Sequence, residues 1–171
     1  FDAAKGTLGS INESALQFTL HARGSGDFDA WIESGHFDSS DDGAEYSGNG
    51  LKSVGLPATA AQAIAVANYV SKNSWSDLDG TTRTHWELAN EISNTSSRGP
   101  SRREDLTGPK PEIAAPGTFI ASALSENYGA TRSRTTPDGV HVLLTGTSMS
   151  APHVSGTVAL MLEAKSDLSP A

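Results

Sequence analysis

The pattern of apolar and polar residues divides the chain into two parts. In residues 15–34, apolar positions alternate with polar ones on both sides of Gly24-Ser-Gly26, a pattern that predicts a β-hairpin. Residues 35–50 are mostly Gly, Ser, Asp and Asn and therefore predict a loop. We interpret residues 1–52 as a small β-rich segment, distinct from a second part that covers residues 53–171.

In the second part, short apolar runs alternate with segments of helical character. Residues 57–63 favour a short helix that begins at Pro57. Residues 71–97 are polar, with Trp75 and Trp86 as expected apolar anchors. Short strands are expected at residues 64–67, 111–117, 119–124 and 140–144. Because strands alternate with helices, the pattern predicts an α/β fold with a mostly parallel sheet.

The longest apolar segment follows a turn at Thr145-Gly146 and predicts a helix from about residue 147 to about 165. Its apolar residues surround the helix on nearly every side, and such a helix is expected to be buried. Pro152 is expected to be tolerated because it lies in the first turn of this helix, where no backbone N–H is needed.

Composition and charge exclude several classes of protein. Twelve Lys and Arg against 20 Asp and Glu give a net charge of −8, which argues against nucleic acid as a partner. The absence of cysteine excludes disulfides and thiolate metal sites. No apolar run reaches the roughly 18–20 residues of a membrane span. The first residues resemble neither an initiator Met nor a signal peptide, and a helix-start signal at Ser169-Pro170 has no helix after it. We therefore expect a fragment of a longer protein.

Ser148 is the strongest candidate for chemistry. A serine hydroxyl needs a base and oxyanion donors to act as a nucleophile, and a helix N-terminus offers free backbone N–H groups and a positive dipole. Gly146, just before Thr147, lets a substrate approach closely. The alternative is that Thr147 or Ser148 only caps the helix. His153 lies five residues beyond Ser148, so we interpret it as a structural histidine rather than the base.

Three segments resemble one protein family. Residues 146–156, Gly-Thr-Ser-Met-Ser-Ala-Pro-His-Val-Ser-Gly, resemble the serine motif of the subtilases, the subtilisin-like serine endopeptidases. Residues 96–100 with 110–117, and residues 57–67, resemble two upstream blocks of that family, although Ala67-Asn68 replaces the usual Gly-Ala. The resemblance covers about residues 53–171 and implies a partial subtilisin-like parallel sheet with a buried helix after the serine. Residues 1–52 would then be a β-rich insertion.

The resemblance also implies which residues act. Ser148 is expected to be the nucleophile and its N–H an oxyanion donor, with Gly146 and Thr147 supporting the motif. The family's Asp and His motifs do not occur here, nor does a convincing oxyanion Asn, since Asn49 fits a turn better. These residues are expected upstream of Phe1, so the chain alone should be nearly inactive. The other histidines lack the motif context, and the acidic loop residues are interpreted as solvated charges; these residues are His21, His36, His85 and His141, and Asp41, Asp42, Asp77 and Asp79.

The resemblance implies no cofactor and no metal site in this chain, although subtilases often bind structural calcium. The expected partners are a peptide or protein substrate and the upstream part of the same protein, with no nucleic acid and no membrane. Secretion is expected on the resemblance alone. The alternative function is a non-catalytic subtilase-like module that binds a partner or self-associates, because an open sheet edge favours homo-oligomers.

Overall fold

The computed structural model describes residues 50–103, 105 and 108–169. The chain divides into two units, Phe1–Glu33 and Ser34–Ala171, and every described residue belongs to the second. The expected hairpin at residues 15–34, the expected loop at residues 35–50 apart from Gly50, and Asn49 lie outside the described residues, so the interpretation of residues 1–52 stays a prediction.

One pair of strands is parallel. β1 (Val66–Tyr69) pairs with β4 (Ile113–Pro116), with Asn68 opposite Ala115. Both strands were expected, but β1 begins two residues later than the apolar run at 64–67. Before the strand, the Ala65 N–H donates to the Glu112 carboxylate at 2.8 Å, and the Ala65 carbonyl accepts from the Glu112 N–H at 3.1 Å.

The other strand pairs are antiparallel. β5 (Ile120–Ala123) pairs with β6 (His141–Leu144), and the 3-10 helix η1 (Arg132–Arg134) lies in the connection between them. β2 (Ser74–Ser76) pairs with β3 (Thr82–Thr84) across a tight turn. The expectation of a mostly parallel sheet was therefore wrong for the described residues. Antiparallel strands need no crossover helix, so the helix-strand alternation expected from the sequence is not required between them.

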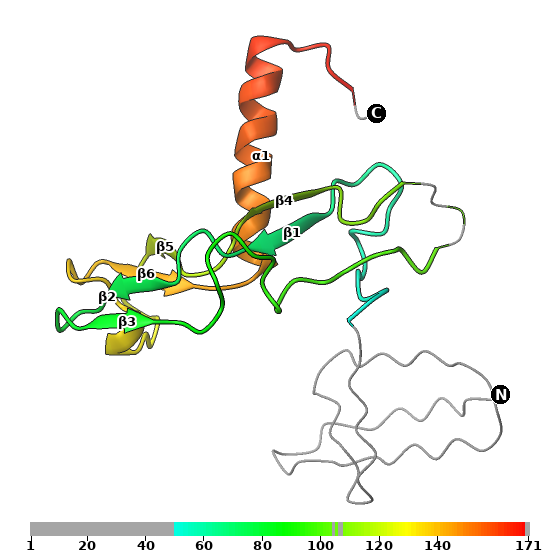
Figure 1. Cartoon of the computed structure of the whole chain (residues 1–171). Helices are drawn as coiled ribbons and strands as arrows, with labels where there is room; N and C mark the ends of the chain where they lie inside the picture. Colours follow the sequence, from blue (N-terminus) through cyan, green and yellow to red (C-terminus); the bar gives the residue numbers. More distant parts are fainter. Residues whose placement is uncertain (1–49, 104, 106–107, 170–171) are drawn as a thin grey trace, which may run out of the picture. The chain divides into compact units, whose positions relative to one another are not determined.

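A single long helix follows β6 among the described residues. α1 (Thr147–Ala164) begins and ends within one residue of the predicted bounds. Its first turns pack on β1 and β4, whereas its later turns extend beyond the strands (Figure 1). The contact region is built from small residues such as Ala67 and Gly117, which allow the helix to approach the strands closely.

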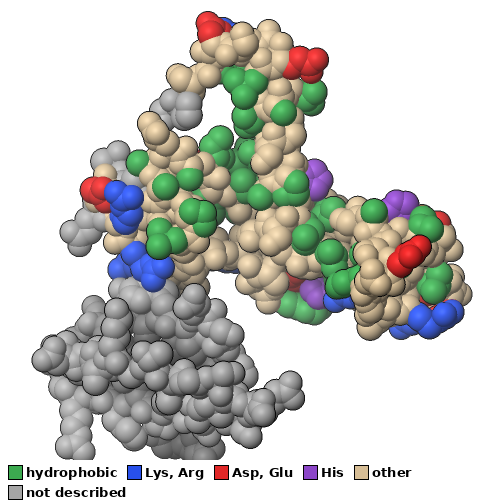
Figure 2. Space-filling model, turned by 180° about the vertical axis from the view of Figure 1, so that it is seen from behind, with side chains coloured by type: hydrophobic (Ala, Val, Ile, Leu, Met, Phe, Trp, Pro, Cys, Tyr) green, Lys and Arg blue, Asp and Glu red, His purple; other side chains and the backbone are tan. Residues whose placement is uncertain are grey.

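The expectation that α1 is buried was wrong for the described residues. Only Ser150 is fully buried, whereas Leu160 and Met161 are 67% and 51% exposed. Hydrophobic side chains lie uncovered along the column formed by this helix (Figure 2). The apolar pattern indicates that the helix needs a cover, and no described residue covers its C-terminal half.

Residues 57–63 form turns rather than the expected short helix. Thr59 N–H donates to the Gly55 carbonyl, but the following bonds reach back only three residues. The carbonyls of Ala60 and Ala63 accept hydrogen bonds from the Lys110 ammonium, at 3.1 and 2.5 Å. The Lys110 ammonium thus binds carbonyl oxygens that would accept backbone hydrogen bonds if a helix continued here.

No helix among the described residues could span a membrane. The small core is formed by residues of β1, β4 and β6 and of the segments beside them. Trp75 is half-buried against Phe119 and is an anchor, as expected, but Trp86 is 70% exposed and is not. The centroid of the Trp86 ring lies 5.3 Å from that of the His85 ring. The buried apolar residues are Val54, Ala65, Ala67, Val70, Ala115, Phe119, Val142 and Leu143.

Candidate active site

The turn before α1 presents Ser148 to solvent. Gly146 adopts φ +146° and ψ 167°, a conformation that disfavours any side chain, and its N–H donates to the Gly117 carbonyl at 2.8 Å. A Cβ at residue 146 would stand 3.9 Å from the Ser148 nitrogen, an ordinary van der Waals contact. Glycine at this position is therefore required by the backbone conformation of the turn rather than by lack of space.

Ser148 does not cap the helix. The N-cap is Gly146, and no side-chain hydrogen bond caps the helix end. Ser148 is the second residue of α1 and is exposed, and neither its hydroxyl nor its backbone N–H makes a hydrogen bond among the described residues. The capping interpretation of Thr147 and Ser148 is therefore wrong. An exposed hydroxyl beside a free amide at a helix N-terminus is the arrangement that a nucleophile with its own oxyanion donor requires.

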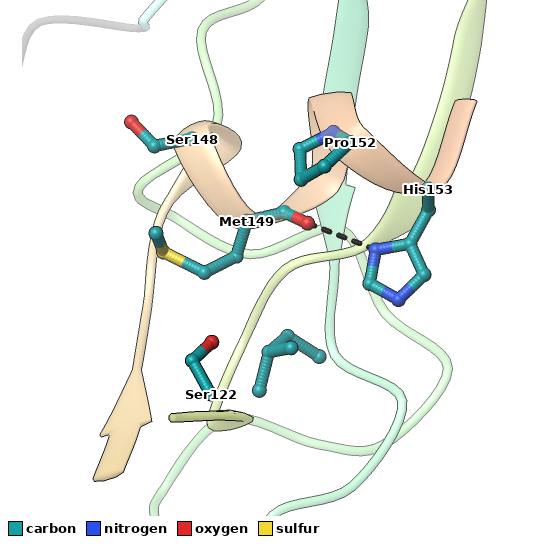
Figure 3. A pocket seen from close by; sticks show the side chains of 6 residues that line it. Ser122, Ser148, Met149, Pro152 and His153 are labelled. Carbon is teal, nitrogen blue, oxygen red and sulfur yellow. Dashed lines mark hydrogen bonds between the residues drawn. The ribbon is translucent and has the colours of Figure 1, made fainter. Parts of the chain in front are cut away.

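A hollow of about 260 Å³ lies beside Ser148. Figure 3 shows the Ser148 side chain and the His153 ring directed to opposite sides of the first turns of α1. The Nδ1–H of His153 donates to the Met149 carbonyl at 2.8 Å, which fixes the ring against its own helix. His153 is thus a structural histidine, although it is exposed rather than part of a buried segment. The hollow is lined by Ile120, Ser122, Ser148, Met149, Pro152 and His153.

Pro152 lies in the second turn of α1, not in the first as expected. It is the sixth helical residue, so its missing N–H leaves the Ser148 carbonyl without the usual partner four residues on. The helix continues through this position to Ala164. The first turn, which carries the nucleophile, is consequently joined to the rest of the helix by one hydrogen bond fewer.

Buried polar side chains lie close to the start of α1. The Asn68 side chain donates to the Thr95 hydroxyl at 3.0 Å and accepts from the Thr118 hydroxyl at 3.2 Å. The Ser150 hydroxyl is buried and has no partner among the described residues. A Cβ at Gly117 would collide with both Ser150 and Asn68. Sequence reasoning noted Asn68 only as a departure from the family pattern; a polar residue inside an apolar strand was the available signal.

The other described histidines lie in separate interactions. His85 packs edge-on against the Phe119 ring and stands 3.6 Å from Glu87, whereas His141 donates to Asp138 at 2.7 Å. Neither is hydrogen-bonded to Ser148. His21 and His36 lie outside the described residues. Among the described residues, no group of three or more His, Asp or Glu side chains is arranged to hold a metal ion.

The acidic residues of the β2–β3 turn have structural partners. Asp77 is fully buried, which corrects its interpretation as a solvated charge. The Arg83 guanidinium donates to its carboxylate at 2.7 Å and holds the pKa of Asp77 below its ordinary value, and the Thr81 and Asp79 N–H groups act in the same direction. Asp79 is exposed and pairs with Arg132, which lowers the pKa of Asp79. Asp41 and Asp42 lie outside the described residues.

Comparison with known proteins matches this chain to one protein family. A family model described as the Subtilase family matches residues 12–171. Subtilisin-like protease SBT1.9 of Arabidopsis thaliana is 45% identical over 86 residues, which cover 48% of this chain and 11% of that protein. Subtilisin-like protease SBT3.8 of the same plant is 40% identical over 84 residues, covering 49% of this chain and 10% of that protein. The aligned part thus spans about a tenth of the length of these relatives.

Proposed function

Because the chain belongs to the subtilase family, we propose that it carries the nucleophile of a serine endopeptidase and that this nucleophile is Ser148. The observation that carries the proposal is the exposed Ser148 hydroxyl at the start of an 18-residue helix, where no described residue is hydrogen-bonded to it. In the proposed reaction the hydroxyl oxygen attacks a peptide carbonyl carbon, and its proton passes to a general base. The leaving amine takes up that proton, and water then hydrolyses the acyl-enzyme.

The Ser148 amide is proposed as one oxyanion donor. Its N–H has no hydrogen-bond partner among the described residues, and it lies at the positive end of the α1 dipole. Gly146 and Thr147 are assigned supporting roles in the motif. A donor of this kind stabilises the negative charge that develops on the carbonyl oxygen.

The general base, the carboxylate that orients it and a second oxyanion donor are proposed to come from an upstream part of the same protein. Two observations support this. Ser148 has no histidine partner among the described residues, and the alignment spans about a tenth of the related proteases. The exposed apolar residues of α1 are proposed to be covered by that same upstream part, because burial of such a face is what drives domain assembly.

The experiment compares covalent labelling in two proteins. The complete protein should react with a fluorophosphonate at Ser148, and Ser148→Ala should abolish the labelling. The isolated 171-residue chain should label at a rate lower by several orders of magnitude, because the base is missing. Rapid stoichiometric labelling of the isolated chain at Ser148 would contradict the proposed division of the triad. A complete protein that hydrolyses peptides equally well as Ser148→Ala would refute the assignment of the nucleophile.

A second function is favoured by the exposed apolar residues near the C-terminal end of α1. Leu160, Met161 and Leu162 are 67%, 51% and 40% exposed. A second copy of the chain would cover some of these side chains in a non-catalytic, self-associating module. Light scattering of the complete protein separates the two functions, since a monomer that also hydrolyses peptides excludes the module.

We also keep two expectations as proposals. Residues 1–52 are proposed to form an insertion before the catalytic part at 53–171, and limited proteolysis near residue 52 would test that boundary. Secretion is supported by the resemblance to the subtilases, and detecting the mature protein in the culture medium of the producing cells would test it.

A further inference from the structure

Two hydrogen bonds fasten the serine turn, residues 145–148, to the loop between β4 and β5. The Gly146 N–H donates to the Gly117 carbonyl at 2.8 Å, and the Phe119 N–H donates to the Thr145 hydroxyl oxygen at 3.0 Å. Thr145 is the first residue after β6 and lies three residues before Ser148. The second bond depends on one side-chain oxygen, so it can be removed without altering any main-chain group.

Phe119 is held in an unusual backbone conformation. Its φ is +54°, in the left-handed region that bulky residues avoid, and its side chain is 1% exposed. Such a conformation persists only when the surroundings hold it, and strained residues of this kind gather at functional sites. In Phe119 this backbone conformation directs the amide towards Thr145.

The ring of Phe119 is held on three sides. Trp75 stacks on it with ring centroids 4.1 Å apart, His85 meets it edge-on at 5.0 Å, and the Arg134 guanidinium lies 4.7 Å from its centroid. Trp75 is itself fixed, because its Nε1–H donates to the Ser133 carbonyl at 2.9 Å. The contacts come from β2, from the segment after β3 and from η1, so three separate segments fix one ring.

We propose that Phe119 and Thr145 are positioning residues for Ser148. The aromatic cluster fixes the Phe119 ring, the ring fixes the backbone, and the Phe119 amide then holds the Thr145 side chain and with it the serine turn. The inference rests on the proposed nucleophilic role of Ser148. Neither residue is assigned a contact with the reacting atoms.

The test removes the Thr145 acceptor while keeping the shape of the side chain. In the complete protein, Thr145→Val should slow fluorophosphonate labelling of Ser148 by about five- to tenfold, the effect of one lost hydrogen bond on a barrier. Thr145→Ser restores the hydroxyl and should label within about twofold of the unsubstituted protein. Thr136→Val, which removes a hydroxyl that donates to Asp138 and to the His141 carbonyl, is the matched control and should leave the rate unchanged. Equal rates for Thr145→Val and Thr145→Ser overturn the proposal.

A double-substitution cycle tests the link to Phe119. Phe119→Leu removes the ring contacts, whereas Phe119→Tyr keeps them. If Phe119 acts through Thr145, the double variant Phe119→Leu with Thr145→Val should label no more slowly than the slower single variant. If the reductions in labelling rate of the two single variants multiply in the double variant, Phe119 does not act through Thr145. If Phe119→Leu does not fold, Arg134→Gln removes one ring contact from an exposed position and replaces it in the cycle.

Amide hydrogen exchange separates failure of this inference from failure of the proposed function. Thr145→Val should speed exchange at the Phe119 and Gly146 amides relative to Thr145→Ser. Unchanged exchange at both amides overturns the positioning role, whatever the chemistry of Ser148. If the unsubstituted complete protein is not labelled, the assignment of Ser148 as the nucleophile is refuted. The positioning role of Thr145 and Phe119 is then refuted with it.

Discussion

Gly117 and Ser150 lie so close together that a Cβ on Gly117 would overlap the Ser150 hydroxyl oxygen. The contact forms where the first turn of α1 crosses the end of β4, two residues from the exposed Ser148. The side-chain oxygen of Asn68 would stand 2.5 Å from the same Cβ. The distance between the helix and the parallel strand pair is therefore set by the absence of a side chain at residue 117.

Gly117→Ala should accordingly destabilise the fold. The nearest atoms belong to the short, buried side chains of Ser150 and Asn68, so these side chains or the elements that carry them must shift, at a cost of about 1–3 kcal/mol for overpacking. Urea unfolding followed by circular dichroism measures the change. Gly129→Ala is the matched control, because no atom lies within 4 Å of its added Cβ. Equal unfolding midpoints for the two variants would contradict the close contact.

Ser150→Ala should have the opposite effect, or none. The Ser150 hydroxyl is buried without a partner among the described residues, and such a group costs about 1–3 kcal/mol in lost hydration. Replacing the hydroxyl by a hydrogen removes this cost. Thermal unfolding should therefore show an unchanged or higher midpoint. The contrasting variant is Thr118→Val, which leaves the Asn68 oxygen without its donor and should lower the midpoint.

How far the sequence predicts this structure depends on where the determining contacts lie. β5, β6 and α1 could be predicted because each is an apolar run limited by Gly, Pro or polar residues. The β2–β3 hairpin was missed because most of its strand residues are exposed and polar, although Asp79-Gly80 is a hairpin-turn signal and Gly80 has φ +76°.

The candidate site shows the same division. The motif around Ser148 pointed to the proposed nucleophile, because a helix start and its glycine are local features. The hydrogen bonds from Gly146 to Gly117 and from Phe119 to Thr145 join residues about 25 or more positions apart, and no rule of sequence spacing predicts them. The burial of α1 was misjudged for a related reason. An apolar pattern states that a helix needs a cover, but it does not say which segment provides one.

Acid should weaken the contact between Lys110 and Glu112. Burial opposes ionisation of Glu112, but the Lys110 ammonium at 2.5 Å and the Ala65 N–H outweigh it, so the pKa of Glu112 lies below its ordinary value of 4.5. A carboxylate with a lowered pKa stabilises the folded state above the unfolded pKa, and this contribution is lost as the pH falls through the folded pKa. Unfolding midpoints measured between pH 7 and pH 2 should fall less steeply in Glu112→Gln, and identical slopes would contradict the pairing.

Lys110→Met tests the same contact by removing the ammonium group. The Lys110 side chain is 3% exposed and donates to two carbonyls as well as to Glu112. Its loss should cost roughly 1.5–3 kcal/mol, the range for hydrogen bonds of charged groups. Lys165→Met is a suitable control, since Lys165 is 66% exposed and stands 4.0 Å from Asp167. A loss no larger than that of the control would show that the turns at residues 57–63 do not depend on the ammonium.

The exposed face of α1 yields a prediction whose sign depends on its surroundings. In the isolated chain, Leu160→Gln with Met161→Gln should reduce self-association, because less apolar area is removed from water when two copies meet. Analytical ultracentrifugation over a concentration series measures the dissociation constant. Leu168→Gln is the control, since Leu168 is exposed outside the helix. In the complete protein the double substitution should instead lower the unfolding midpoint, because the proposed upstream segment covers these side chains. A complete protein that is indifferent to the substitutions would contradict that cover.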